Sequence, residues 1–211
     1  MIYAMKTNFI LLLVFSLTIL NCNVIFAQTA EFDPNTLKTE YYKDASVVDG
    51  NTFKDKQGNR FKIKKTSGAN GLYIDIGAKG VEKWVQHGVW YDMGSDGHVY
   101  AKTIWNKGKK HGVCEKYHAN GKINFLYTYV NDLKEGTAYQ YNDKGEIIEE
   151  CPYVNGLKEG VRLSYHSNGQ VNFRSTFHDD LREGEAYQYN DKGEHIGTVV
   201  WIHGVAQPKQ K

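Results

Sequence analysis

The chain repeats itself every 24 residues between Gly88 and Val205, and this repeat constrains the fold more than any other feature. The first glycine of each copy is Gly88, Gly112, Gly136, Gly160 or Gly184, and a second follows nine residues later at Gly97, Gly121, Gly145, Gly169 or Gly193. A fixed period of this length is typical of repeat proteins.

Each copy also carries two aromatic positions in phase with its glycines. The first lies five residues after the first glycine and holds Met93, Tyr117, Tyr141, Tyr165 and Tyr189. The second lies seventeen residues after it and holds Trp105, Tyr129, Tyr153, Phe177 and Trp201. We refer to these two sets as the tyrosine line and the second aromatic line.

The pattern inside one copy predicts two short strands and two turns. Val113, Glu115 and Tyr117 alternate as strand residues do, and residues 123–129 alternate again after a turn at 118–121. Further turns fall at 131–132, 155–156, 179–180 and 203–204, so turns recur about every dozen residues, as in an antiparallel meander. Helical repeats do not tolerate so many turn glycines, and leucine-rich repeats need more leucines than these copies contain.

The repeated pattern Tyr153-x-Asn155-Gly156-x-x-x-Gly160-x-x-x-x-Tyr165-x-x-x-Gly169 resembles the MORN repeat, specifically its bacterial variant. The resemblance covers residues 88–205 and implies an all-β fold, in which tandem hairpins form one elongated, single antiparallel meander. It also implies protein scaffolding and, in some members, membrane-lipid contact. Bacterial variants are often labelled antitoxins of toxin–antitoxin systems, which a fold does not establish.

The N-terminus reads as a targeting segment. Lys6 is its only charge, residues 9–20 are almost continuously apolar, and Ala27 ends the segment, which predicts a signal peptide over residues 1–27. The apolar run is short for a membrane span, and Asn21 makes Cys22 a poor lipidation site. We therefore expect an exported protein that is periplasmic, in the outer envelope or extracellular.

The rest of the chain divides around the repeats. Residues 28–87 are expected to form an atypical, β-rich N-terminal cap with degenerate hairpins, and residues 206–211 a disordered tail. Pro152 falls inside an expected central strand, where we expect a bulge or a shortened strand.

Charge and cysteine content restrict the function classes. Loss of Lys6 with the signal peptide leaves 25 basic minus 24 acidic residues, a net charge of +1 that gives no basic excess for nucleic acid. Cys114 and Cys151 remain, three strands apart, or about 14 Å at about 4.8 Å per strand, too far for a disulfide.

We find no pattern that predicts catalysis, a metal or a cofactor. The eight histidines form no ligand motif, and solvated turn residues explain them best. Adjacent carboxylates such as Glu149 and Glu150 point to opposite faces of a strand, and no serine has a nucleophile context. The chain is not expected to be an enzyme.

The aromatic lines are the only candidate binding residues. We expect them to be mainly the core of the sheet itself, so that Tyr141→Ala costs about 3–5 kcal/mol. They also form a candidate groove for an extended partner or an organic cation. The candidate residues are Trp105, Tyr117, Tyr129, Tyr141, Tyr153, Tyr165, Tyr189 and Trp201.

Two functions follow as hypotheses. The first is a secreted, non-enzymatic interaction or scaffold protein that binds a protein or a cell-envelope component, with possible membrane-lipid contact and no nucleic acid. The second is an antitoxin-like protein that neutralises a partner toxin, although typical antitoxins act in the cytoplasm.

Overall fold

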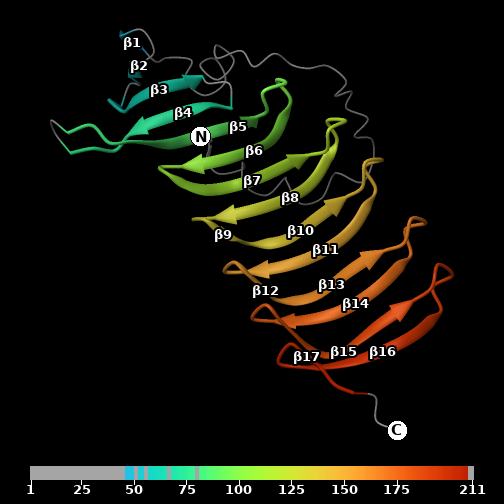
Figure 1. The fold of residues 1–211 in the computed structure, drawn as a ribbon. Helices are drawn as coiled ribbons and strands as arrows, with labels where there is room; N and C mark the ends of the chain where they lie inside the picture. Colours follow the sequence, from blue (N-terminus) through green and yellow to red (C-terminus); the bar gives the residue numbers. More distant parts are fainter. Residues whose placement is uncertain (1–45, 50–51, 55–56, 66–67, 79–80, 209–211) are drawn as a thin grey trace, which may run out of the picture.

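In the computed structural model, residues 46–49, 52–54, 57–65, 68–78 and 81–208 are described. The expected signal peptide and much of the expected cap lie outside these ranges. Seventeen strands of the described residues form one antiparallel sheet, and the ribbon in Figure 1 is a single curved layer. No helix in the described part of the chain is long and apolar enough to cross a membrane.

The strands follow one another through the sheet as a meander, which confirms the expected topology. The N-terminal strands are β1 Ser46–Asp49, β2 Thr52–Lys54, β3 Arg60–Lys65, β4 Ala69–Asp75 and β5 Trp84–Met93. The next are β6 Val99–Asn106, β7 Lys109–Tyr117, β8 Ile123–Val130, β9 Leu133–Lys134, β10 Gly136–Tyr141, β11 Ile147–Val154 and β12 Leu157–Lys158. The last are β13 Gly160–Tyr165, β14 Val171–His178, β15 Leu181–Tyr189, β16 His195–Ile202 and β17 Val205–Ala206.

One edge of the sheet is closed by two-residue hairpin turns. Asn155 and Gly156 have φ angles of 50° and 88°, and Asp179 and Asp180 have 48° and 65°. Two successive positive φ angles define the type I′ turn, whose twist matches that of the flanking strands. A glutamate of the preceding copy caps the turn, since the backbone N–H of Asn155 donates to the Glu135 carboxylate at 2.9 Å.

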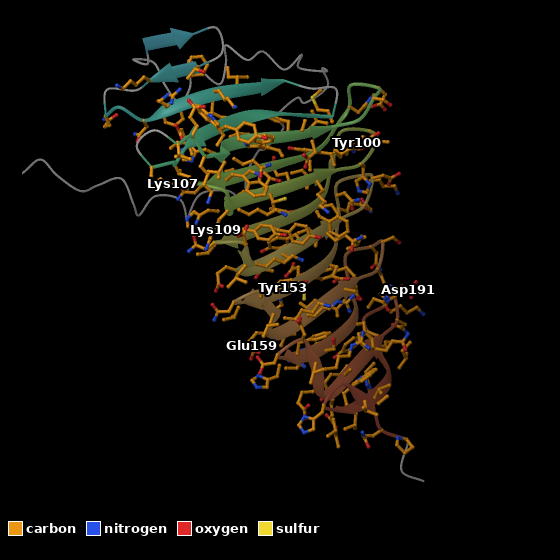
Figure 2. All side chains as sticks on the ribbon, turned by 60° about the vertical axis from the view of Figure 1, so that its left-hand side comes forward. Tyr100, Lys107, Lys109, Tyr153, Glu159 and Asp191 are labelled. Atoms are coloured by element: carbon orange, nitrogen blue, oxygen red, sulfur yellow. The ribbon has the colours of Figure 1, made fainter. Side chains whose placement is uncertain are left out.

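The opposite edge carries four-residue turns that an asparagine organises. In the turn at 142–145, Asn142 Oδ1 accepts the backbone N–H groups of Lys144 and Glu146, both at 3.0 Å. Asn190 repeats this arrangement 48 residues later. Figure 2 shows the two edges, with Lys107 and Glu159 on one and Tyr100 and Asp191 on the other.

Pro152 occupies a position where the pairing between neighbouring strands is interrupted in the other copies as well. Glu159, opposite Pro152, separates β12 from β13, and Glu135 separates β9 from β10 opposite Thr128 in the same way. The expectation of a bulge is therefore right, but its cause is the repeat and not the proline. A bulge tolerates proline because it has already interrupted the ladder of hydrogen bonds. The β11 strand is not shortened.

The repeats bury small side chains rather than their aromatic lines, which corrects the expectation that both lines are core. Cys114 and Cys151 are each 4% exposed, Ser175 and Ala186 only 1%. Of the two aromatic lines, only Phe177 is fully buried and the others are half-buried. In the part of the chain that the structure describes, no second sheet covers the large side chains, so mainly the small residues between them lose their solvent contact.

Cys114 and Cys151 are free thiols, as expected. Cys114 lies opposite Tyr127 on β8, and Cys151 lies opposite Ala138 on β10. The β8–β10 pairing between them completes the expected separation of three strands.

Candidate functional site

The two aromatic lines lie on opposite faces of the sheet. Residues directly opposite one another in an antiparallel pair share a face, and neighbours along a strand alternate. Cys114 therefore shares a face with Tyr127 and Tyr129, while Glu115 lies on the other. Tyr117 follows a register shift and donates its hydroxyl to Glu115 at 2.5 Å, which places it on the face of Glu115.

We call the face with the second aromatic line the ladder face, because basic side chains alternate with its aromatic rings. Four tight turns each set a residue of this line directly opposite a cation, as in the pairs Tyr153 with Lys158 and Phe177 with Arg182. The last turn sets Trp201 opposite Ala206. The ladder consists of Trp105, Lys110, Tyr129, Lys134, Tyr153, Lys158, Phe177, Arg182 and Trp201, in that order across the sheet. In Figure 2, the label Tyr153 locates the ladder, which runs near the edge of the sheet that carries Glu159.

The cations of the ladder lie over the rings. Lys134 Nζ is 4.7 Å from the ring centroid of Tyr153 and 4.3 Å from that of Tyr127. The Arg182 guanidinium is 4.6 Å from the ring centroid of Trp201. The others contact at 5.2–5.7 Å: Lys110 with Trp105 and Tyr129, Lys158 with Phe177, and Arg182 with Phe177. These are cation–π contacts, each worth about 0.5–1 kcal/mol at exposed sites.

The cations of the ladder have no direct carboxylate partner in the described chain, although Asp132 and Asp180 lie beside Lys110 and Lys158. Among the described residues, none of the four cations forms an ion pair with an acidic side chain. Burial lowers the pKa of Lys134, and the positive charges of Lys158 and Lys116 act in the same direction. A ring attracts a cation but leaves its net charge in place, so the ladder retains a positive potential.

The ladder face contains one ion pair in its middle row. Arg162 forms two charge-assisted hydrogen bonds with Glu149, which holds the pKa of the guanidinium above its usual value. Arg162 lies opposite Ser175, whose small side chain leaves room for it. This bidentate pair neutralises itself, so it does not reduce the charge of the ladder.

The tyrosine line on the other face is tied to carboxylates instead. Besides the bond from Tyr117 to Glu115, Tyr187, which lies on the same face but outside the line, donates to Glu185. Burial and a hydrogen bond with Glu150 raise the pKa of Tyr165 to about 12. Lys102 pairs with Glu115 at 3.6 Å. Glutamates of this face are therefore engaged by Tyr117, Tyr187 and Lys102.

The structure thus separates the eight predicted site residues into two groups. Trp105, Tyr129, Tyr153 and Trp201 belong to the ladder, and Tyr117, Tyr141, Tyr165 and Tyr189 to the other face. They do not form one groove. The sequence interpretation missed the four cations, which recur two residues before each glycine at 110, 134, 158 and 182. Their 24-residue spacing could have identified them as part of the repeat.

Two histidines have structural roles that the solvated-turn interpretation missed. His118 Nε2 lies 2.9 Å from the backbone oxygen of Tyr141, and His166 Nε2 lies 2.9 Å from that of Tyr189. Asn120 Nδ2 adds a bond to the backbone oxygen of Asp143 at 2.7 Å. Each such turn is tied to the next hairpin along the same edge.

One exposed turn gathers three groups that can act as metal ligands. Ligand atoms of Glu159, His178 and Asp179 lie within 4.8 Å of one another. His178 Nδ1 is 3.0 Å from a Glu159 oxygen, and the Asp179 backbone N–H donates to the same carboxylate at 3.1 Å. The bond from Asp179 repeats the glutamate cap of the turns at Asn155 and His203, so the fold itself brings Glu159 to this turn.

Comparison with protein families identifies three tandem segments. Residues 110–131, 134–155 and 158–179 match the MORN repeat variant. Each matched segment begins at a ladder cation, Lys110, Lys134 or Lys158. The first and last of the five expected copies fall outside the match, although their hairpins continue the same sheet. No curated protein matches the chain.

Proposed function

We propose that this protein is an exported, non-enzymatic interaction module whose ladder face binds a protein or cell-envelope partner. MORN repeats are in general modules for protein or membrane interaction, and three copies here match that family. What we propose in addition is the surface that binds the partner and the compartment in which the protein acts.

The observation that supports the ladder face is its row of alternating cations and rings, in which no cation forms an ion pair with a described acidic side chain. Half-buried aromatic side chains are typical of binding surfaces because they supply contact area, and a row of cations attracts a partner of opposite charge. The opposite face offers less to a charged partner, since its glutamates already accept from Tyr117 and Tyr187 and pair with Lys102.

Export is proposed from the sequence of residues 1–27, which lie outside the described residues. The mature protein is expected to begin at or near Gln28. Mass mapping of the N-terminus in protein from the native host decides this point. An intact Met1 on cytosolic protein would contradict export.

The binding surface can be tested with matched charge reversals. Lys134→Glu with Lys158→Glu inverts the middle of the ladder, and Lys144→Glu with Lys192→Glu makes the same charge change in exposed turns of the opposite edge. Pull-downs from envelope fractions, quantified by mass spectrometry, should recover partners with the wild type and the turn variant but not with the ladder variant. Partners retained equally by all three proteins would overturn the assignment of this face.

The alternative function, an antitoxin-like protein that neutralises a partner toxin, stays a hypothesis. No contact described above favours it over the interaction module. The same pull-down addresses it. Recovery of a toxin encoded beside this gene, and rescue of growth when both are expressed, would replace the scaffold proposal.

A further inference from the structure

The ladder has a regular spacing that selects the geometry of a partner. Lys110, Lys134, Lys158 and Arg182 lie on alternate strand positions, with one ring of the second aromatic line between neighbouring cations. Adjacent strands are about 4.8 Å apart, so successive cations are separated by about 9.5 Å. A partner that contacts them all needs an anionic group about every 9.5 Å along one side.

A polyproline II chain has this repeat. It rises about 3.1 Å per residue with three residues per turn, so every third side chain points the same way, about 9.3 Å apart. A β-strand fits poorly, because residues on one side recur every second position, about 6.6 Å apart. In an α-helix, two full turns span about 10.8 Å, and the mismatch accumulates to several ångströms over three steps.

The rings between the cations suit such a chain as well. Proline-rich polyproline II segments dock against aromatic surfaces, and their preformed conformation reduces the entropy lost on binding. Tyr129, Tyr153 and Phe177 each lie between two cations of the ladder. A polyproline II chain has no internal hydrogen bonds, and its solvated backbone suits a binding face that is open to water.

We propose that the ladder binds an extended acidic segment of a partner protein in the polyproline II conformation, with Asp or Glu at every third position. The inference rests on the proposed function, because it takes the ladder as the binding surface, and it adds the chemistry and spacing of the ligand. The acidic groups bind the four cations, and the intervening prolines or apolar residues pack on the rings.

Two carboxylates of the protein lie where they weaken the attraction between the ladder and an acidic ligand. Asp132 Oδ1 accepts the backbone N–H of Lys110, and Asp180 Oδ1 accepts that of Lys158, both at 2.7 Å. Their negative charges lie beside the ladder. Asp180→Asn keeps the acceptor oxygen and removes the charge, so this variant should bind the acidic segment more tightly, by about two- to fivefold at low salt.

The test uses synthetic fluorescent peptides and the full chain. The probe repeats Glu-Pro-Pro, and the spacing control has the same composition with its glutamates clustered at one end. We expect saturable binding of the probe by fluorescence anisotropy, at least about threefold tighter than the control. The affinity should fall as salt rises, and about tenfold or more in the double variant Lys134→Glu with Lys158→Glu. The matched turn variant Lys144→Glu with Lys192→Glu should bind as the wild type does.

Equal affinity for the probe and the clustered control would overturn the polyproline II assignment. Binding only to vesicles that contain anionic lipid, with no binding of either peptide, would replace the peptide ligand with a membrane surface. Failure of both ligands would reject this inference alone, because ladder-dependent capture of a partner in the pull-down tests the proposed function separately. Circular dichroism of each variant shows whether a loss of binding reflects loss of the fold.

Discussion

The two ends of this sheet are held together in different ways. Among the N-terminal strands, Phe53, Phe61, Leu72 and Ile74 are at most 6% exposed and form one cluster, with Ile63 and Val85 packed against it. In the repeats, most fully buried side chains are small and the large rings are half-buried. The N-terminal strands thus have an apolar core, whereas among the described residues no second layer covers either face of the repeats.

The difference shows how a single-layer sheet can be stable. Its strands gain from backbone pairing, from turns that asparagine and glutamate side chains cap, and from contacts of each copy with its neighbours, which are the nearest-neighbour terms of a linear array. Because these terms recur in every copy, no single large side chain dominates. The cost is exposed apolar surface, including Val154 at 45% and Leu157 at 40%.

The largest expected effect is at the N-terminal cluster. Phe61 is 2% exposed, and Phe61→Ala should destabilise this end of the sheet by about 3–5 kcal/mol. Native-state hydrogen exchange of the amides in β3 to β5 measures the loss. As a control, Ile196→Ala removes a side chain that is 57% exposed and should change stability by less than about 0.5 kcal/mol.

Overpacking the small core of the repeats should have the next largest effect. Ala186 is 1% exposed, so Ala186→Leu forces neighbouring side chains or strands to move and should cost about 1–3 kcal/mol. Urea denaturation compares it with Ala119→Leu, which adds the same group in an exposed turn. Equal stability of the two variants would show that the row of small residues is not packed.

Truncation of a half-buried ring should cost less than either. Tyr141→Ala removes a ring 6.4 Å from that of Tyr139, with solvent access on the open face, and should cost about 1–2 kcal/mol. The sequence alone predicted about 3–5 kcal/mol, from the assumption of a closed core. Thermal melts of Tyr141→Ala beside Phe61→Ala discriminate between the values, and a cost equal to that of Phe61→Ala would restore the closed-core interpretation.

The smallest effect concerns a turn cap. The Glu159 carboxylate raises the pKa of His178 above its ordinary value of 6.5. The contact between protonated His178 and Glu159 therefore stabilises the folded protein fully at pH values below the pKa of His178 in the unfolded chain. This stabilisation is lost as the pH rises through the pKa of His178 in the folded protein. NMR titration should find the His178 pKa above 6.5, and Glu159→Gln should return it towards that value. An unchanged His178 pKa in Glu159→Gln would remove Glu159 as the cause.

The sequence predicted the hairpins well, because turn chemistry is local and the period multiplies the signal. Asn155-Gly156 indicates a tight turn on its own, and five copies in phase make the meander unambiguous. The free thiols followed from the strand count alone.

The sequence could not predict the faces or the ladder. Strand alternation places Tyr117 on the face of Glu115, but whether Tyr129 shares that face depends on the register of the hairpin, which shifts between Lys116 and Tyr117. The position of Lys134 over the ring of Tyr153 depends on the hairpin register, which the strand pattern alone does not give. Burial of the rings depends on whether a second layer exists, which is a tertiary property.

The most direct test of the single-layer account is the solvent access of named rings, measured by NMR with a soluble paramagnetic agent. Tyr141 on one face and Tyr153 and Trp201 on the other should all show strong relaxation enhancement, while Phe61 should be protected. Protection of either face to the level of Phe61 would contradict the account, since it would mean that a second layer covers that face.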